Sequence, residues 1–473
     1  MKKKWWVVEV ENNKGREAKD KTKEGIVDYL IIGNSASGLA AAESIRETDR
    51  KGRLVILTEE EYTNYSKPLI TYYLAGKVSL ENIYFKPASF YKDNDIELLT
   101  STMAGSIVTG KSEVITAGGQ KIKYGKLLIA SGGRPIVPRI KISSKPGKDA
   151  LPFDFIDSSN CRDAGGIFTL TTLEDSIRIK NYIEKNEIKS MTILGGGLIG
   201  LKSAEAFLEI GIKINIVELA DRILAATFDS QASGIIENAI ESRGSRIYKN
   251  NTIDEIFTDS GKVCGYRLRD GRENDCDLLV MAIGVNPDLG LIKEGAIETG
   301  RGIKVDRKMQ TSADDVYAAG DIVDGLDILH EENRNIAIWP LAVRQGNIAG
   351  SNMAGNTVDY EGGFFMNSVE ILGIPSISMG ITNITMQDDD TVEIKKDFRP
   401  NQNLYKKIVI KDNKIIGIIM LGNIERAGIY AGLIRNKIDL SSVKENIFRE
   451  DFGIIHLPSE YKKHLVVGEG IEV

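Results

Sequence analysis

The clearest pattern along the chain is an apolar run that passes directly into a glycine-rich turn. Residues 27–32 have the composition of a buried strand, and the turn Gly33-Asn34-Ser35-Ala36-Ser37-Gly38 follows without a break. An Ala-rich segment at residues 39–47 has the character of a helix, and residues 54–57 form a second apolar run that ends shortly before Glu59. This order predicts a strand, a tight turn, a helix and a second strand, which together form a βαβ unit.

The same pattern occurs a second time. Residues 191–194 predict a strand, Gly195-Gly196-Gly197-Leu198-Ile199-Gly200 a turn, and residues 202–210 a helix. Residues 214–217 predict the next strand, which ends at Glu218. Two such openings in one chain predict two nucleotide-binding domains.

Beyond Gly355 the pattern changes to antiparallel-type strands followed by one helix, at residues 374–381, 405–410, 415–421 and 427–435. We therefore predict an α/β protein with two Rossmann-like dinucleotide-binding domains and a C-terminal α+β interface domain. The segments we expect are a mobile extension at 1–24, a discontinuous first domain at 25–146 and 299–358, a second domain at 147–298, and a third at 359–473. Residues 137–166, rich in Pro, Ser, Asp and Lys, predict a connector.

The glycines of the second turn have distinct roles in binding a dinucleotide. Gly195 permits the tight turn, Gly197 lets the backbone approach a pyrophosphate, and Gly200 lets the helix pack close to the strand. The phosphates would then bind the first amides of the helix. Glu218 lies roughly 20 residues further on, where an acid binds the ribose 2′-hydroxyl. Because an acid repels a 2′-phosphate, we predict NADH rather than NADPH, a preference that the nearby Arg222 would weaken.

The first turn departs from this pattern because Ser35 replaces its middle glycine. A serine can hydrogen-bond a phosphate, and Glu59 is the matching acid. A third element is the strand at 316–319 that ends in Gly320-Asp321, where the carboxylate is placed to bind a polyol such as a ribityl chain. The helix predicted at residues 343–353 would stabilise negative charge at its N-terminus, such as that of a reduced flavin.

Charge and composition exclude other classes of function. The net charge of −6 gives no basic field for nucleic acid, and the apolar stretch near the N-terminus is too short to span a membrane. The three cysteines, Cys161, Cys264 and Cys276, and the three scattered histidines match no metal-site spacing, so we expect no metal. Free thiols without a signal-peptide pattern predict a reducing, cytoplasmic location.

Together these motifs resemble the FAD-dependent pyridine nucleotide-disulfide oxidoreductases over residues 25–440. The branch that they resemble most includes NADH:rubredoxin reductases and the flavoprotein parts of NAD(P)H-nitrite reductases. The resemblance rests on both glycine turns and on Tyr65-Ser66-Lys67-Pro68-Leu69, Leu127-Leu128-Ile129-Ala130-Ser131-Gly132-Gly133, Ala282-Ile283-Gly284-Val285-Asn286-Pro287 and Ala318-Ala319-Gly320-Asp321. It implies hydride transfer from NADH to the N5 atom of FAD, and an interface domain at residues 404–438.

Combined with the motif chemistry, the resemblance gives two sets of expected binding residues. Those for FAD are Gly33, Ser35, Ala36, Ser37, Gly38, Glu59, Lys67, Ser131, Gly132, Gly320, Asp321, Leu341 and Ala342. Those for NAD are Gly195, Gly197, Leu198, Ile199, Gly200, Glu218 and Gly284.

The chain departs from the family at two places. Relatives carry a redox-active cysteine or cysteine pair after the second strand, whereas residues 59–80 contain none, which excludes cysteine chemistry there. Relatives often place a glutamate at the position of Lys202. We hypothesise that Lys67 and Lys202 both approach flavin N5 and stabilise the reduced anion, with Glu205 as a partner of Lys202. The alternative is that Lys202 faces solvent.

The function we predict is an NADH:acceptor oxidoreductase that passes electrons to a small protein such as a rubredoxin, a ferredoxin or an iron–sulfur subunit. The alternatives are an NADH oxidase that reduces oxygen, and a non-catalytic FAD-binding subunit of a redox complex. Basic residues of the C-terminal segment suggest an acidic partner, namely Lys406, Lys407, Lys411, Arg426 and Arg435.

Overall fold

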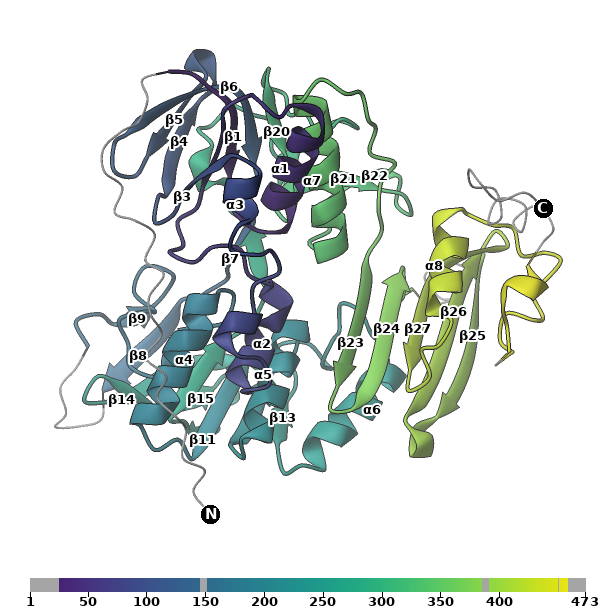
Figure 1. Cartoon of the computed structure of the whole chain (residues 1–473). Coiled ribbons are helices and arrows are strands. Elements are labelled where there is room, and N and C mark those ends of the chain that lie inside the picture. The colour runs from purple at the N-terminus through teal and green to yellow at the C-terminus, as the bar shows by residue number, and fades with distance from the viewer. Residues whose placement is uncertain (1–24, 145–150, 385–390, 450, 458–473) are drawn as a thin grey trace.

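The computed structural model describes residues 25–144, 151–384, 391–449 and 451–457 (Figure 1). The predicted extension at 1–24 lies outside the described residues. The first sheet has the order β3-β2-β1-β6-β5-β4, with β20 paired to β6. Its central strands, β1 (Val27–Ile32), β2 (Leu54–Leu57) and the carboxyl half of β6 (Lys121–Ile129), are parallel and almost wholly buried. The remaining strands are β3 (Ile96–Leu99), β4 (Ala104–Val108) and β5 (Glu113–Thr116).

Strand β20 (Val316–Ala318) lies parallel to β6 and pairs Ala318 with Ile129. The segment that ends in Gly320-Asp321 therefore returns to the sheet that carries the first glycine turn. This pairing is what a discontinuous first domain requires, while the exact residue boundaries of the domains stay a prediction.

A second parallel sheet, built from strands between residues 167 and 281, has the order β10-β17-β11-β12-β13. Its strands are β10 (Ile167–Thr169), β17 (Leu278–Met281), β11 (Ser190–Leu194), β12 (Lys213–Val217) and β13 (Arg246–Tyr248). Helices α4 (Leu173–Lys185), α5 (Leu198–Glu209) and α6 (Ser230–Glu241) accompany this sheet. Both predicted βαβ openings are present, with β1–β2 and β11–β12 as their strand pairs.

The region predicted as a connector contains strands, which corrects that prediction. Strand β8 (Ile140–Ser144) pairs in parallel with β14 (Ile253–Asp259), and β9 (Phe155–Ile156) extends the same sheet. The sheet is completed by β15 (Lys262–Leu268) and β16 (Glu273–Asp275). Ile140 and Ile142 are buried in its apolar core, so alternation over a few residues outweighed the Pro- and Ser-rich composition.

Three helices begin earlier than the sequence predicted, at the glycine turns and at a proline. Helix α1 spans Ala36–Thr48, α5 begins at Leu198, and α7 spans Trp339–Met353 rather than 343–353. Pro340 is tolerated in the first turn of α7 because the amide it lacks has no intrahelical acceptor there. The sequence pattern therefore predicts turn or loop for residues that form the first turn of each of these helices.

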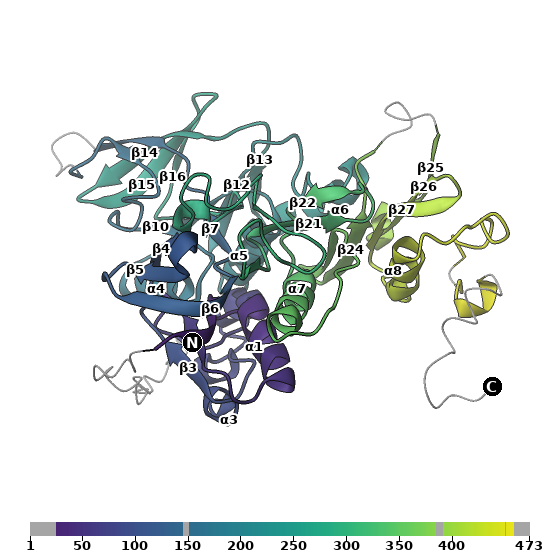
Figure 2. The same ribbon diagram turned by 90° about the horizontal axis from the view of Figure 1, so that it is seen from above.

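Helices α1 and α7 lie side by side (Figures 1 and 2) and meet through small residues. A Cβ added to Gly346 would lie 2.2 Å from the backbone oxygen of Ser37, and one added to Gly350 would lie 2.3 Å from that of Ala41. Side chains larger than hydrogen would force the helices apart. This contact fixes the start of α7 relative to the first glycine turn.

The C-terminal sheet is antiparallel, with the order β23-β24-β27-β26-β25. Its strands are β23 (Met366–Ile371), β24 (Ile374–Gly380), β25 (Val392–Arg399), β26 (Leu404–Lys411) and β27 (Lys414–Leu421), and helix α8 (Ala427–Arg435) packs on one face. The other face contributes Ile371, Tyr405 and Leu421 to the core that contains α5 and α6. The predicted α+β domain is therefore packed against the part of the chain that contains α5 and α6.

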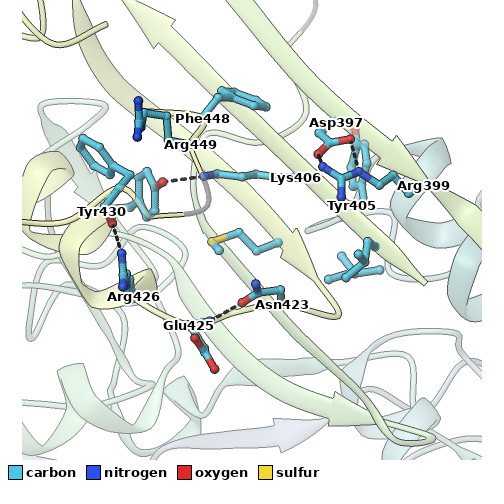
Figure 3. Close-up of a pocket in the computed structure, with 14 residues that line it drawn as sticks. Asp397, Arg399, Tyr405, Lys406, Asn423, Glu425, Arg426, Tyr430, Phe448 and Arg449 are labelled. Atoms are coloured by element: carbon cyan, nitrogen blue, oxygen red, sulfur yellow. Dashed lines mark hydrogen bonds and ion pairs between the residues drawn. The ribbon is translucent and has the colours of Figure 1, made fainter. Parts of the chain in front are cut away.

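Two of the basic residues predicted to face an acidic partner are used inside the protein. Lys407 is 3% exposed, and its ammonium lies 3.3 Å from the carboxylate of Asp229. Lys406, on the opposite face of β26, donates a hydrogen bond of 2.5 Å to the hydroxyl of Tyr430 (Figure 3). The prediction of a docking surface is therefore wrong for Lys407, which strand alternation directs towards Asp229, whereas Lys406 is half-buried and lines a cleft. In the described part of the chain, no helix is long and apolar enough to cross a membrane.

Replacing Gly346 with valine should destabilise the protein by about 3 kcal/mol or more, because the added side chain overpacks the contact with α1. Flavin content should fall with it. Thermal unfolding and the ratio of flavin to protein absorbance measure both effects. Gly234→Ala is the matched control, since Gly234 in α6 has no atom within 4 Å of an added Cβ. A Gly346→Val protein as stable as this control would contradict the packing argument.

Candidate active site

The first glycine turn leaves no room for side chains at its two ends. Gly33 has a φ of +115°, and a Cβ there would lie 2.1 Å from the backbone oxygen of Ala130. A Cβ on Gly38 would lie 2.0 Å from the oxygen of Gly33. Ser35 is the N-cap residue of α1, but its side chain makes no capping hydrogen bond. Its hydroxyl and the first amides of α1 are therefore left for a ligand.

A cavity with about 690 Å³ of empty space, part of it open to solvent, borders this turn. Two buried polar atoms of its lining, Nδ2 of Asn34 and Oγ of Ser131, have no hydrogen-bond partner. Buried polar groups are nearly always bonded, so unpartnered ones indicate a missing ligand. A phosphate- and hydroxyl-rich cofactor such as FAD fits them.

The Gly320-Asp321 turn joins the first glycine turn as predicted. A Cβ on Gly320 would lie 2.6 Å from Oγ of Ser37 and 3.7 Å from Cβ of Ala342, so β20, α1 and α7 converge here. The amide of Gly320 donates to Oε1 of Gln345 in α7 at 2.9 Å, a contact that the sequence motifs do not predict. Leu341 and Ala342 lie in the buried first turn of α7.

The carboxylate of Asp321 has no hydrogen-bond or ion-pair partner within the described ranges. Burial raises the pKa of Asp321, and the positive charge of Lys67 opposes that rise. Lys67, at the start of the 3-10 turn Lys67–Leu69, lines the cavity and likewise has no bonded partner among the residues described. Burial also raises the pKa of Glu60, whose carboxylate accepts a 2.7 Å bond from the hydroxyl of Tyr65. Lys67 therefore brings a positive charge without a bonded side-chain partner to a cavity lined by the half-buried carboxyl group of Glu60, and that charge also acts on Asp321.

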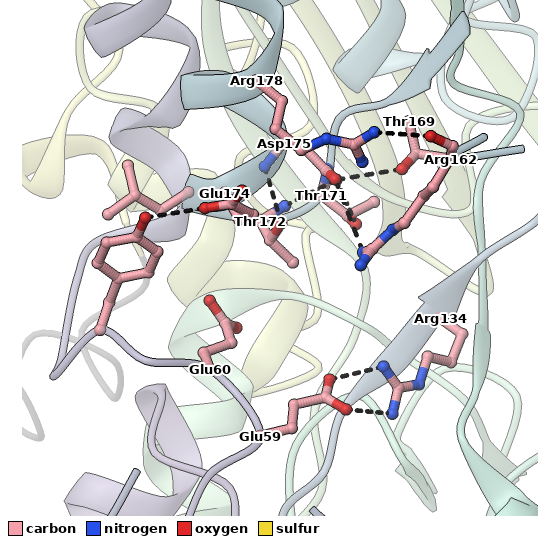
Figure 4. Close-up of polar contacts among 12 residues, drawn as sticks. Glu59, Glu60, Arg134, Arg162, Thr169, Thr171, Thr172, Glu174, Asp175 and Arg178 are labelled. Atoms are coloured by element: carbon pink, nitrogen blue, oxygen red, sulfur yellow. Dashed lines mark hydrogen bonds and ion pairs between the residues drawn. The ribbon is translucent and has the colours of Figure 1, made fainter. Parts of the chain in front are cut away.

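Glu59 lines the cavity, but its carboxylate is bound by a residue that the sequence analysis missed. Both nitrogens at the tip of Arg134 lie 2.6 Å from its two oxygens (Figure 4). The third nitrogen lies 2.9 Å from Asp288. Arg134 directly follows the motif residues Ser131-Gly132-Gly133, and this position is a usable signal in the sequence. Ribose binding by Glu59 stays a prediction, and Arg134 is a second cavity-lining group that could bind a cofactor.

The second glycine turn repeats the geometry of the first. A Cβ on Gly195 would lie 2.4 Å from the oxygen of Ala282, and one on Gly200 would lie 2.1 Å from the oxygen of Gly195. Gly197 is the N-cap residue of α5, the place that Ser35 takes in α1, and a Cβ on it would meet nothing within 4 Å. This is the open space that a pyrophosphate needs.

The two turns differ in exposure. Residues 34 and 36–38 of the first turn are buried, whereas Gly197 and Ile199 of the second are exposed and Leu198 is half-buried. The first site thus suits a cofactor that stays bound, and the second suits a dinucleotide that enters and leaves.

The acid of the second unit is held against its own turn. One oxygen of Glu218 accepts from the amide of Gly196 at 2.6 Å, and the other from Ala220 at 2.7 Å. Arg222, expected to weaken the preference for NADH, donates instead to the carbonyl of Phe228 and the carboxylate of Asp221. With Arg222 bound in this way, the negative charge of Glu218 dominates near the ribose position.

The remaining predicted residues lie where the two halves meet. The short strands β7 (Gly133–Pro135) and β18 (Val285–Pro287) pair with each other. Gly132 and Gly284 precede these strands with positive φ values of 75° and 116°. The two glycines let the backbone turn just before the paired strands β7 and β18.

Lys202 and Lys67 lie in different surroundings. The ammonium of Lys202 forms an ion pair with Glu205 and donates a 3.0 Å bond to the backbone oxygen of Glu370 in β23. Glu205 in turn accepts from the amide of Leu372. The predicted Glu205 partner is thus present, and Lys202 is neither solvent-facing nor part of the cavity lining. A flavin role for Lys202 would require these contacts to break, so we retain that proposal for Lys67 alone.

The segment from Glu59 to Leu80 is fixed between the two halves and contains no sulfur nucleophile. The hydroxyl of Tyr62 donates to Glu174 at 2.8 Å, and that of Tyr65 accepts from the amide of Leu173 in α4. Cys161 and Cys276 lie in the core of the β8–β14–β15 sheet. Burial raises the pKa of both thiols, to about 12 for Cys276, so they stay protonated. In the described residues no cluster of His, Cys, Asp or Glu could hold a metal ion.

Family comparison places this architecture. Residues 27–346 match the pyridine nucleotide-disulphide oxidoreductase family, and residues 366–438 match the rubredoxin NAD+ reductase C-terminal domain. The chain therefore belongs to the pyridine nucleotide-disulphide oxidoreductase family. It is an NAD(P)H-dependent flavoprotein oxidoreductase whose cofactors are FAD and NAD(H), which confirms the predicted fold class and cofactors.

Individual relatives align along most of the chain. It is 28% identical to subunit epsilon of the NADH-dependent phenylglyoxylate dehydrogenase of Aromatoleum evansii, covering 88% of this chain and 93% of that protein. It is 28% identical to the NADH-rubredoxin oxidoreductase of Clostridium acetobutylicum (88% and 96%) and 30% identical to an NADH oxidase of Methanocaldococcus jannaschii (69% and 70%). The crystal structure of the Clostridium enzyme shares the fold, with a TM-score of 0.67 and 23% identity over 89% of this chain and 98% of that one.

Gly197→Val should abolish NADH binding and leave FAD bound. The protein accepts the side chain because nothing lies within 4 Å, but the side chain fills the space left for the pyrophosphate. NADH titration followed by flavin bleaching, together with the flavin content of the purified protein, measures both effects. Loss of flavin with intact NADH binding would reverse the assignment of the two turns.

Asp321→Ala should weaken FAD retention by roughly 10–100-fold, the effect of losing a hydrogen bond to a charged group. Asp321→Asn, which keeps the shape and one acceptor oxygen, should lose less. Fluorescence titration of the FAD-free protein with FAD gives the dissociation constants. Equal affinity in all three proteins would remove Asp321 from the site.

Proposed function

We propose that this protein oxidises NADH and passes the electrons one at a time to a small iron–sulfur or rubredoxin-type protein. The observation that carries the proposal is the composition of the cavity beside the first glycine turn. Its wall from residue 59 to residue 67 presents carboxyl, hydroxyl and ammonium groups and no thiol. Without a cysteine to take the electrons, the acceptor must lie outside the described chain.

The chain's own residues bind and orient. The amides at the start of α5 and the space at Gly197 hold the pyrophosphate of NADH, and Glu218 favours a free ribose hydroxyl over a phosphate. The start of α1, Ser131 and Asp321 would hold FAD. When bound, FAD would supply a group that accepts two electrons from NADH and releases them one at a time. Hydride transfer needs no protein acid or base, so the catalytic contribution is the relative placement of the two sites.

The C-terminal part supports a protein acceptor. Its match to a rubredoxin NAD+ reductase domain is joined by relatives named for rubredoxin, and a structure with the same fold is a complex of putidaredoxin reductase with putidaredoxin. One relative is named as a subunit of a dehydrogenase. This name favours a variant of the proposal in which the partner in electron transfer is an iron–sulfur subunit of a larger enzyme.

Direct reduction of oxygen is the second candidate, favoured by the 30% identity to an NADH oxidase. A non-catalytic role fits less well, because both glycine turns keep their geometry and the second is open to solvent.

Stopped-flow reoxidation separates these candidates. Flavin reduced by one equivalent of NADH should reoxidise at least about tenfold faster with oxidised rubredoxin or ferredoxin than with air-saturated buffer. Fast turnover with oxygen alone would favour the oxidase. Failure of NADH to bleach the flavin would favour the non-catalytic role.

Lys67→Met should lower the flavin midpoint potential by roughly 30 mV, which for two electrons is about 1.4 kcal/mol, because it removes a positive charge that stabilises reduced flavin. Lys202→Met is the control and should shift the potential much less, since Glu205 already balances its charge. Spectroelectrochemical titration gives both values. Equal shifts, or none for Lys67→Met, would contradict the assignment.

A further inference from the structure

A second cleft lies in the C-terminal part of the chain, formed by residues other than those that line the cavity at the first glycine turn (Figure 3). Its walls come from β25, β26 and β27, from the start of α8, and from the loop before residue 452. It holds about 620 Å³ of empty space, part of it open to solvent. None of the roles assigned above uses it.

A partly buried ammonium group lies at its base. Lys406 stands directly opposite Asp397 in the β25–β26 pair, but both oxygens of that carboxylate bind Arg399, at 3.1 and 2.7 Å. The ammonium donates instead to the hydroxyl of Tyr430 at 2.5 Å and to the carbonyl of Ile447 at 3.1 Å. Within the described ranges its third hydrogen has no acceptor. Burial lowers the pKa of Lys406 to about 8, so this charge is incompletely compensated.

A second cation borders the cleft on strained backbone. Arg426, the residue before α8, has φ +63° and ψ 12°, a left-handed conformation that glycine or asparagine adopts more easily. Its guanidinium donates one bond of 3.3 Å to the carbonyl of Phe452 and has no ion-pair partner among the described residues.

The wall beside these cations is apolar and aromatic. The ammonium of Lys406 lies 4.7 Å from the ring centre of Tyr430 and 5.3 Å from that of Phe448. Phe452 and Met420 lie behind this side and are buried in the core, with the ring of Phe452 packed on those of Tyr430 and His456. A ligand held here would therefore meet the half-buried ring of Phe448 next to positive charge.

We propose that this cleft binds a small organic anion, with its carboxylate or phosphate between Lys406 and Arg426 and its flat apolar part against the half-buried ring of Phe448. The anion supplies a negative charge to Lys406, because the carboxylate of Asp397 bonds to Arg399 instead. The positive end of the α8 dipole adds to the attraction. The aromatic wall selects a ligand with a planar body over a bare inorganic ion. The proposal does not depend on the identity of the electron acceptor.

Isothermal titration calorimetry of the FAD-loaded full chain tests it, with NAD+ saturating the second turn. The probes are phenyl phosphate and benzoate, which distinguish a phosphate from a carboxylate head, and inorganic phosphate, which lacks the ring. We expect one of the aromatic anions to bind at about one site per chain, at least about tenfold more tightly than inorganic phosphate.

Variants assign the binding to the cleft. Arg426→Gly and Lys406→Met should each weaken it by about tenfold or more. Arg426→Gly also relieves the backbone strain, so its melting temperature should be no lower than that of the wild type, which separates lost binding from unfolding. Arg435→Gln removes one exposed charge from the far end of α8 and should bind as the wild type does.

The pH dependence gives an independent readout. Wild-type affinity should fall as pH rises from 7.5 to 9.5, because Lys406 loses its charge, whereas Lys406→Met should show a flatter profile. The titratable groups that line the cleft with Lys406 are Asp397, Arg399, Tyr405, Glu425, Arg426, Tyr430 and Arg449. Carboxyl, guanidinium and phenol groups in general titrate outside this range. The proposal is wrong if neither aromatic anion binds at millimolar concentration, if inorganic phosphate binds as tightly as both, or if Arg426→Gly binds unchanged.

Discussion

The backbone of each glycine turn approaches the helix that follows so closely that no side chain fits between them. A Cβ would lie 2.0 Å from a carbonyl oxygen at Gly38 and 2.1 Å at Gly200. This approach places the first amides of α1 and α5 beside the carboxyl ends of the central strands, where a dinucleotide binds an α/β sheet. The contact between α1 and α7 extends the same constraint, since Gly346 and Gly350 hold α7 close enough to join the Gly320-Asp321 turn to the first site.

The two turns share a geometry but not an environment, and the difference gives each its role. The first turn is enclosed by β20, α7 and the segment after β2, and beside it Nδ2 of Asn34 and Oγ of Ser131 have no hydrogen-bond partner. The second is open at Gly197 and is screened by the negative charge of Glu218. We propose that the first turn is an enclosed FAD site and the second an open NADH site, and that the electrons pass to an outside acceptor because residues 59–80 contain no cysteine.

Sequence reasoning located what depends on local backbone chemistry. Both βαβ units follow from glycine spacing, which marks positions where a Cβ is forbidden. The link between the first turn and the Gly320-Asp321 segment is instead what the family resemblance implies. Contacts between distant segments could not be predicted in the same way. Nothing in the sequence ties Lys202 to Glu370, or Lys407 to Asp229, because those pairs form only when the C-terminal sheet packs against α5 and α6. Short alternation at Ile140 and the first turn of α7 were missed because Pro and Ser in their neighbourhood suggest loops.

The most direct measurement of the central claim is an anaerobic titration of the FAD-loaded protein with dithionite. Because residues 59–80 contain no cysteine, flavin should be the only redox group. Reduction should then be complete after two electrons per flavin, with no charge-transfer band between a thiolate and the flavin. Uptake of four electrons, or a long-wavelength thiolate–flavin band at half reduction, would show a second redox group in the chain and contradict the account.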